Sequence, residues 1–377
     1  MLIGHNALRR CVIGSENRDP TLSELEEMKR LLADGLSAGA IGMSLGLFYV
    51  PGSYAKLDEL IALTKVVKEH DGIIAAHIRN ESNKLIEAVE EFLTVIKESG
   101  CRAVFSHHKS CETENHGKVN TTLAMIDKAN AEGYDIYLDV YPYNASSTSL
   151  SARFVPGFMH PKGTTSVLSL LDDEAFCEKL KKWSYEKWKY DLGFTLITTY
   201  EPNHEYEGKN LNEIAAMRGD ENPYDTVLYM LRESGNSVGA CYFTMNENDV
   251  RRVISHPRAM ICTDSSVMRN SRRFHPRLSS SFPRAIRYAR DFGVTTLPEM
   301  IRKITSLPAH VYGLKTKGII REGMDADLCI FDADKITDTA DYVNCTKKNE
   351  GIHYVIINGK VVLKDGVYNG VRAAFAR

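Results

Sequence analysis

The sequence has 377 residues, of which 43% are hydrophobic and 25% charged, and its formal net charge is −2. These values are typical of a globular protein larger than one average domain, and the near-neutral charge does not favour nucleic acid or a membrane surface as a partner. No apolar run is long enough to span a membrane, and the amino terminus lacks the basic segment and apolar core of a secretory signal. The eight cysteines include no CxxC pair. We therefore expect free thiols and a cytoplasmic location.

Strands and helices are predicted to alternate through the first part of the chain. Thr21 followed by Glu24 indicates a capping box at the start of a helix. Helices are expected at about 21–36, 56–69, 82–97 and 121–132, and strands at about 40–45, 72–77, 102–107 and 134–141. This alternation predicts an α/β protein with a parallel sheet between helices.

The second part of the chain is less regular. Residues 144–190 are interpreted as loop-like, and further strands are expected at 194–199, 238–243 and 259–264, with helices between them. After Gly313 the pattern becomes β-rich at 317–332 and 352–369, with Asn358-Gly359 and Asp365-Gly366 as hairpin turns. The predicted organisation is a barrel over residues 1–313, with an insertion at about 150–258, and a small β-domain over 314–377.

Two histidines lie thirty residues apart, each at the end of a predicted strand: His77 after GIIAA and His107 after RAVFS. The amphipathic stretch between them is long enough for one helix, which predicts a strand–helix–strand unit. In a (β/α)8 barrel the ends of neighbouring strands open onto one catalytic face, so two imidazoles there are a natural half of a zinc site. Alternatively, each imidazole caps its own strand by bonding a backbone carbonyl.

Several strings occur in an order that resembles one known family. They are IGHNALR from Ile3, SLGLFYVPGSYA from Ser44, AAHIRNES from Ala75, SHHK from Ser106, DVYPYNASST from Asp139, MICTDSS from Met260, HPR from His275, SFPRAI from Ser281, TSLPAHVYGL from Thr305 and EGMDADLCIFD from Glu322. The ordered set is similar to that of the N-acyl-D-amino-acid deacylase (D-aminoacylase) family of metal-dependent amidohydrolases. The resemblance covers essentially the whole chain.

The resemblance implies that His77, His107 and Asp264 bind zinc, and that Asp264 also acts as general base and then general acid. Zinc lowers the pKa of a bound water to about 7, which would provide hydroxide at neutral pH. For Asp264 the alternative is a turn or helix-capping residue, because Ser265 and Ser266 follow it.

Substrate contacts are implied for Tyr49, Arg79, Lys109, Tyr141 and Ser147. A site for an N-acyl amino acid needs a cation or hydroxyl donors for the carboxylate and a donor for the developing oxyanion. The alternatives are core packing for the two tyrosines and a structural ion pair, for instance with Glu81, for Arg79 and Lys109. His108 is expected to point away from His107.

The chain departs from the family pattern at its start. It has no His-x-His motif, Cys11 does not lie in the family's cysteine motif, and the first residues match the family's third barrel strand. We therefore expect an incomplete (β/α)8 TIM-type barrel of strands three to eight, open or completed by an N-terminal segment or a second copy in a homo-oligomer. At most one weakly held zinc is expected. Cys262 is a less favoured substitute ligand.

The function indicated is zinc-dependent hydrolysis of N-acyl-D-amino acids to a carboxylate and a D-amino acid. Two alternatives remain at this point. The chain could be a relative without activity of its own, or a hydrolase of cyclic amides such as hydantoins or dihydropyrimidines. The second alternative is disfavoured because those enzymes usually carry a bridging lysine that the resembled family replaces with cysteine.

Overall fold

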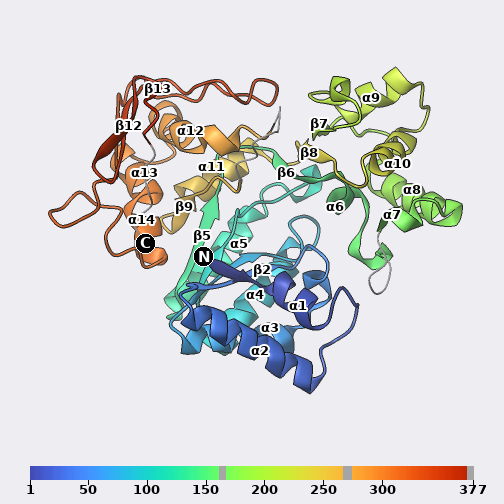
Figure 1. Cartoon of the computed structure of the whole chain (residues 1–377), viewed down its shortest axis with the longest axis horizontal. Coiled ribbons are helices and arrows are strands. Elements are labelled where there is room, and N and C mark those ends of the chain that lie inside the picture. The colour runs from blue at the N-terminus through green and yellow to red at the C-terminus, as the bar shows by residue number, and fades with distance from the viewer. Residues whose placement is uncertain (161–166, 266–273, 372–377) are drawn as a thin grey trace.

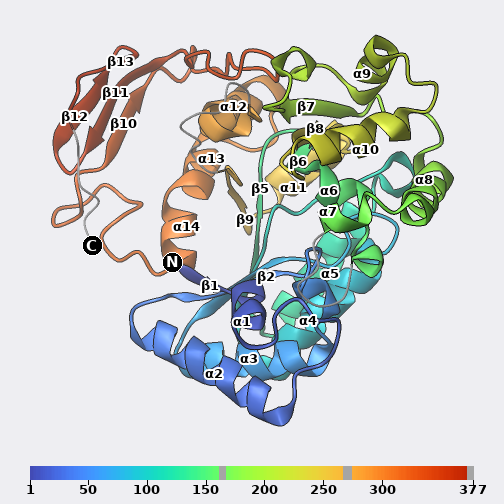
Figure 2. The same cartoon turned by 45° about the vertical axis from the view of Figure 1, so that its right-hand side comes forward.

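The computed structural model, which describes residues 1–160, 167–265 and 274–371, is built around one parallel sheet (Figures 1 and 2). The order of its strands is β1-β2-β3-β4-β5-β9. Their bounds are β1 Leu2–Gly4, β2 Gly42–Gly46, β3 Ile73–His77, β4 Arg102–Phe105, β5 Ile136–Val140 and β9 Ala259–Ile261. Within the described ranges, β1 and β9 each pair with a single neighbour, so the sheet is open as expected. Whether a second copy or a further segment pairs with these edges stays a prediction.

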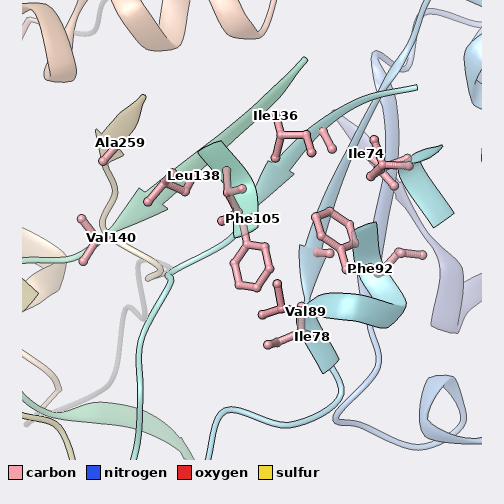
Figure 3. Close-up of a cluster of buried hydrophobic side chains, with 14 of the residues drawn as sticks. Ile74, Ile78, Val89, Phe92, Phe105, Ile136, Leu138, Val140 and Ala259 are labelled. Atoms are coloured by element: carbon pink, nitrogen blue, oxygen red, sulfur yellow. The ribbon is translucent and has the colours of Figure 1, made fainter. Parts of the chain in front are cut away.

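Alternate residues of the strands face two different cores, because successive side chains of a strand point to opposite faces. On the outer face, helices pack against side chains such as Ile74, Phe105 and Leu138, and the ring of Phe105 meets that of Phe92 edge to face at 5.4 Å (Figure 3). The inner face carries the intervening residues, among them Val104 and Tyr137, and is covered by Leu307 and Val311. The outer helices are α1 His5–Val12, α2 Leu22–Ser37, α3 Leu57–Glu69, α4 Leu85–Ser99 and α5 Val119–Ala131.

The predicted helices and strands of this part are all present, although β4 ends at Phe105, two residues before the predicted end at His107. The capping box of Thr21 and Glu24 is present at the start of α2, and β3 ends at His77 as predicted. The strand predicted at 259–264 is shorter, because β9 ends at Ile261 and an irregular segment follows. Helix α11 Glu247–Ser255 precedes β9, and α12 Arg277–Phe292, α13 Leu297–Ile304 and α14 Ser306–Val311 follow it.

The chain between β5 and β9 contains a second group of strands and helices, which is at the upper right of Figure 1. Its antiparallel sheet has the order β6-β8-β7, with β6 Ser146–Ser149, β7 Thr195–Thr199 and β8 Gly239–Tyr242. Its helices are α6 Leu150–Phe154, α7 Val167–Leu170, α8 Glu174–Trp188, α9 Leu211–Arg218 and α10 Pro223–Glu233. The strands predicted at 194–199 and 238–243 are confirmed, and they lie outside the parallel sheet.

The interpretation of 144–190 as loop-like is wrong, because this segment contains β6, α6, α7 and α8. Helix α8 was missed because its charged residues outnumber its few buried ones, Cys177, Leu180 and Ser184. Its start is nevertheless capped by Asp173, whose carboxylate accepts from the backbone N–H groups of Ala175 and Phe176.

The carboxy-terminal part forms a separate antiparallel sheet of four strands. They are β10 Leu328–Phe331, β11 Ile352–Ile357, β12 Lys360–Lys364 and β13 Val367–Tyr368. Asn358-Gly359 and Asp365-Gly366 join consecutive strands, with positive φ of 52° and 75° at the first pair and 46° and 76° at the second. Both hairpin turns are therefore confirmed, although only the end of 317–332 is a strand. No helix in the described ranges has the length and apolar character that a membrane crossing requires.

Candidate metal centre and substrate cavity

Three side chains converge where β3 and β4 end. His77 is the last residue of β3, His107 follows β4 by two residues, and the segment after β3 carries Glu81. One possible ligand atom from each of the three lies within 4.8 Å of the others. The two imidazole rings meet edge to face, with their centroids 4.4 Å apart. The predicted pairing of His77 with His107 therefore holds in space, and Glu81 adds a carboxylate that the sequence interpretation had assigned only to an ion pair.

His77 is chemically suited to hold a metal ion. Burial lowers the pKa of His77 to about 3, so its imidazole is neutral at physiological pH. Its Nε2 is buried and makes no hydrogen bond to any described residue. A neutral imidazole with a free, buried nitrogen is the form that metals bind. The donor set of two imidazoles and one carboxylate is also one that zinc accepts in hydrolases.

Lys109 neutralises the carboxylate of this cluster. Its Nζ lies 2.6 Å from Oε1 of Glu81 and 2.6 Å from Nδ1 of His107. Burial alone would raise the pKa of Glu81, but the ammonium of Lys109 holds it well below its ordinary value. The alternative interpretation of Lys109, an ion pair with Glu81, is therefore confirmed. Its contact with substrate stays a prediction.

Asp264 lines the same cavity as this cluster, three residues after β9, with a positive φ of 44° that is uncommon for a residue with a side chain. Its Oδ2 is 2.9 Å from Nη1 of Arg277. The guanidinium of Arg277 in turn lies over the ring of Tyr141, 4.5 Å from its centroid. Asp264 is not part of the close set formed by His77 and its two neighbours. Its roles as metal ligand and proton carrier stay predictions.

All predicted site residues line one cavity of about 1180 Å³. They are Tyr49, His77, Arg79, His107, Lys109, Tyr141, Ser147 and Asp264. Glu81 and Arg277 line the same cavity and were not predicted as site residues. A signal for Arg277 existed in the HPR string, but burial of a cation beside a carboxylate is decided by the fold.

The guanidinium of Arg79 is held by the protein itself. Its nitrogens donate to the carboxylate of Glu91 at 2.9 Å and to the carbonyls of Ser53 and Ala55, each at 2.8 Å. These contacts support the structural ion pair, with Glu91 in place of the suggested Glu81. His108 bonds Thr122 instead of joining His107, as expected.

The two predicted tyrosines keep their hydroxyl groups near the cavity wall. The hydroxyl of Tyr49 lies 3.3 Å from Oγ1 of Thr148, and that of Tyr141 donates to the sulfur of Met245 at 3.7 Å. Burial raises the pKa of both hydroxyls, so both are protonated and can donate. Both tyrosines thus have a satisfied hydroxyl, and their contact with substrate stays a prediction.

Two further cations line the cavity and share one carboxylate. Arg153 of α6 and Lys187 of α8 both pair with Glu112, at 2.9 Å and 3.1 Å. Both cations line the cavity. Arg153 also lies over the rings of Trp188, Phe194 and Tyr242, at 5.4–5.9 Å. Two cations that share one carboxylate leave about one positive charge for a ligand.

Comparisons with known proteins show the family of this chain. Residues 211–363 match the model of the amidohydrolase family. The chain is 37% identical over 362 residues to an N-acyl-D-glutamate deacylase of Alcaligenes xylosoxydans xylosoxydans, covering 96% of the chain and 66% of that protein. It is 34% identical to a D-aminoacylase of the same organism, covering 99% of the chain and 68% of that protein. The chain thus spans about two thirds of the length of these relatives.

A solved structure adds a metal to the comparison. The N-acyl-D-glutamate deacylase of Bordetella bronchiseptica, in complex with zinc and a phosphonate inhibitor that mimics the tetrahedral intermediate, superposes with a TM-score of 0.80. It is 34% identical, and the match covers 97% of this chain and 69% of that one. A D-aminoacylase structure with a binuclear metal centre has the same TM-score and identity. On its fold and its sequence, this chain belongs to the N-acyl-D-amino-acid deacylase (D-aminoacylase) family of amidohydrolases.

Proposed function

We propose that this chain carries the catalytic site of a zinc-dependent N-acyl-D-amino-acid deacylase, with a preference for acidic amino acids. The observation that carries the proposal is the single cavity that joins the His77, Glu81 and His107 cluster to Asp264 and Arg277. The relatives named above are deacylases of N-acyl-D-amino acids, one of them specific in name for glutamate. We assign the zinc to His77 and His107, with Glu81 or Asp264 as the carboxylate ligand.

Different residues of the cavity are assigned to metal binding, proton transfer and hydrogen-bond donation. A zinc ion held at the cluster would polarise the amide carbonyl and lower the pKa of water to about 7. Asp264 accepts a proton from the water that attacks the carbonyl carbon, and delivers it to the nitrogen of the breaking C–N bond. The products are the free carboxylate and the free amine. The neutral hydroxyl of Tyr141, which donates to the sulfur of Met245 at 3.7 Å, would exchange that weak bond for one to the carbonyl oxygen.

The charges that line the cavity support a preference for acidic substrates. Arg277 is almost fully buried and offers a guanidinium to the α-carboxylate, with Asp264 beside it. Arg153 and Lys187 offer a second cationic position, since Glu112 balances only one of them. A substrate with two carboxylates, such as an N-acyl derivative of D-glutamate or D-aspartate, satisfies both positions. A neutral side chain would leave the second position unused.

The first test is hydrolysis after zinc loading, followed by the release of free amine. We expect N-acetyl-D-glutamate to be cleaved faster than N-acetyl-D-leucine, and N-acetyl-L-glutamate to be cleaved poorly. Loss of a hydrogen bond to a charged group costs about 1.5–3 kcal/mol, so Arg153→Met should lower kcat/KM for the glutamate substrate roughly 10- to 150-fold. The leucine substrate should change less than about threefold by the same reasoning. Arg30→Met on exposed α2 is the control.

Binding can be measured without turnover. The only two tryptophans of the chain, Trp183 and Trp188, both lie on α8, and Trp183 lines the cavity. Titration with N-acetyl-D-glutamate should therefore change the intrinsic fluorescence, and Arg153→Met should weaken the binding. Binding without hydrolysis in the zinc-loaded protein would support the inactive-relative alternative. Equal cleavage of all three substrates would contradict the proposed specificity.

A further inference from the structure

The aspartate that begins the DVYPY string has no role in the reaction above. Its side chain nevertheless forms a hydrogen bond with the backbone of His107, a member of the metal cluster. Asp139 is the fourth residue of β5, on the face of the sheet that also carries Tyr137. Its Oδ1 accepts a hydrogen bond of 2.7 Å from the backbone N–H of His107. Its own backbone carbonyl accepts one of 2.8 Å from the N–H of His108. One residue of β5 therefore holds two consecutive amides of the neighbouring segment.

The segment that it holds has an unfavourable backbone conformation. His107 has a positive φ of 39°, in the left-handed region that residues with a side chain rarely adopt. Such a conformation persists only when surrounding contacts determine it. Position 107 needs this conformation because it turns the chain directly after β4 and places the imidazole beside that of His77. Among the described residues, the side chain that bonds the amide of His107 is Asp139.

Asp139 also reaches the other side of the site. Its carboxylate accepts a hydrogen bond from the thiol of Cys262. Cys262 follows β9 and precedes Asp264 by two positions. The N–H of Cys262 bonds the carbonyl of Val140 at 3.1 Å. The end of β5 thus ties the segment of His107 to the segment of Asp264, whose φ is positive as well.

We propose that Asp139 is a positioning residue that holds His107 in its left-handed turn, and thereby holds the imidazole of His107 where it can bind zinc. The proposal rests on the metal site assigned above. Asp139 acts as a hydrogen-bond acceptor in this role, so an uncharged acceptor of the same shape should serve as well. Residues that orient metal ligands typically change metal affinity 10- to 100-fold when they are removed.

The test compares Asp139→Ala, which removes the acceptor, with Asp139→Asn, which keeps a carbonyl oxygen in place. Two measurements are made on each: the zinc dissociation constant by chelator competition, and hydrogen–deuterium exchange of residues 106–111, which follow β4. We expect Asp139→Ala to bind zinc roughly 10- to 100-fold more weakly and to exchange faster in this segment. Asp139→Asn should match the parent protein in both. Asp139→Ser replaces Asp139→Ala if the latter does not fold.

Asp135→Ala is the matched control, because Asp135 precedes the same strand at its other end and pairs with Arg102 and Arg258. It removes a carboxylate and its ion pairs without contact to His107. Unchanged zinc affinity and exchange in Asp139→Ala would overturn the proposal, as would equal defects in Asp139→Asn and Asp139→Ala. If the parent protein bound no zinc, the assigned metal site would fail, and exchange alone would then decide whether Asp139 holds the turn.

Discussion

The buried pair of Lys109 and Glu81 allows a quantitative prediction about stability. Their side chains are only 3% and 16% exposed, and Nζ lies 2.6 Å from Oε1. Breaking a buried pair by removing one partner typically costs about 3–5 kcal/mol, because the other charge is left without compensation. We therefore expect Glu81→Gln to lower the free energy of unfolding of the metal-free protein by about that amount. Adding Lys109→Met to it should recover a large part of the loss.

The assay is urea unfolding at pH 7 in the presence of a chelator, for the parent protein, both single variants and the double variant. The coupling energy from this cycle measures the pair itself. A cost below about 1 kcal/mol for Glu81→Gln is what an exposed pair would show, and would refute the reasoning from burial. Zinc affinity separates two roles of Glu81. If it is a ligand, Glu81→Gln weakens zinc binding in both backgrounds; if it only balances Lys109, the double variant binds zinc like the parent.

The remaining predictions concern turnover, acid stability and packing. Asp264→Asn should lower kcat by roughly 100-fold or more with little change in KM, measured with N-acetyl-D-glutamate; comparable turnover would mean that another group carries the proton. Burial, aided by Arg277, holds the pKa of His275 well below its ordinary 6.5. The unfolded chain therefore takes up this proton first as the pH falls below 6.5, and His275→Gln should reduce the loss of stability by up to about 1.4 kcal/mol per pH unit, in urea unfolding between pH 7 and 5. Phe105→Ala should cost about 3–5 kcal/mol in the same assay, since the ring is almost fully buried against Phe92; a cost near 1 kcal/mol would contradict the packing in Figure 3.

Patterns within a few residues of one another determined the elements of this protein. The capping box of Thr21 and Glu24, the apolar run that ends at His77 and the turn at Asn358-Gly359 each depend on neighbours along the chain. Such features depend on local backbone preferences and side-chain spacing, so they could be predicted. Helix α8 could not, because its buried stripe is too short to stand out from its charged residues.

The site combined both kinds of information. The positions of His77 and His107 at the ends of adjacent strands follow from sequence, because a parallel sheet brings such ends to one edge. Three features required the tertiary structure: the pairing of Arg277 with Asp264, the shared use of Glu112 by Arg153 and Lys187, and the bond from His107 to Asp139. Each joins residues from separate elements. Each also depends on burial, which strengthens the interactions between charged or hydrogen-bonding groups. Burial is a property of the packed molecule, which is why no local pattern could reveal it.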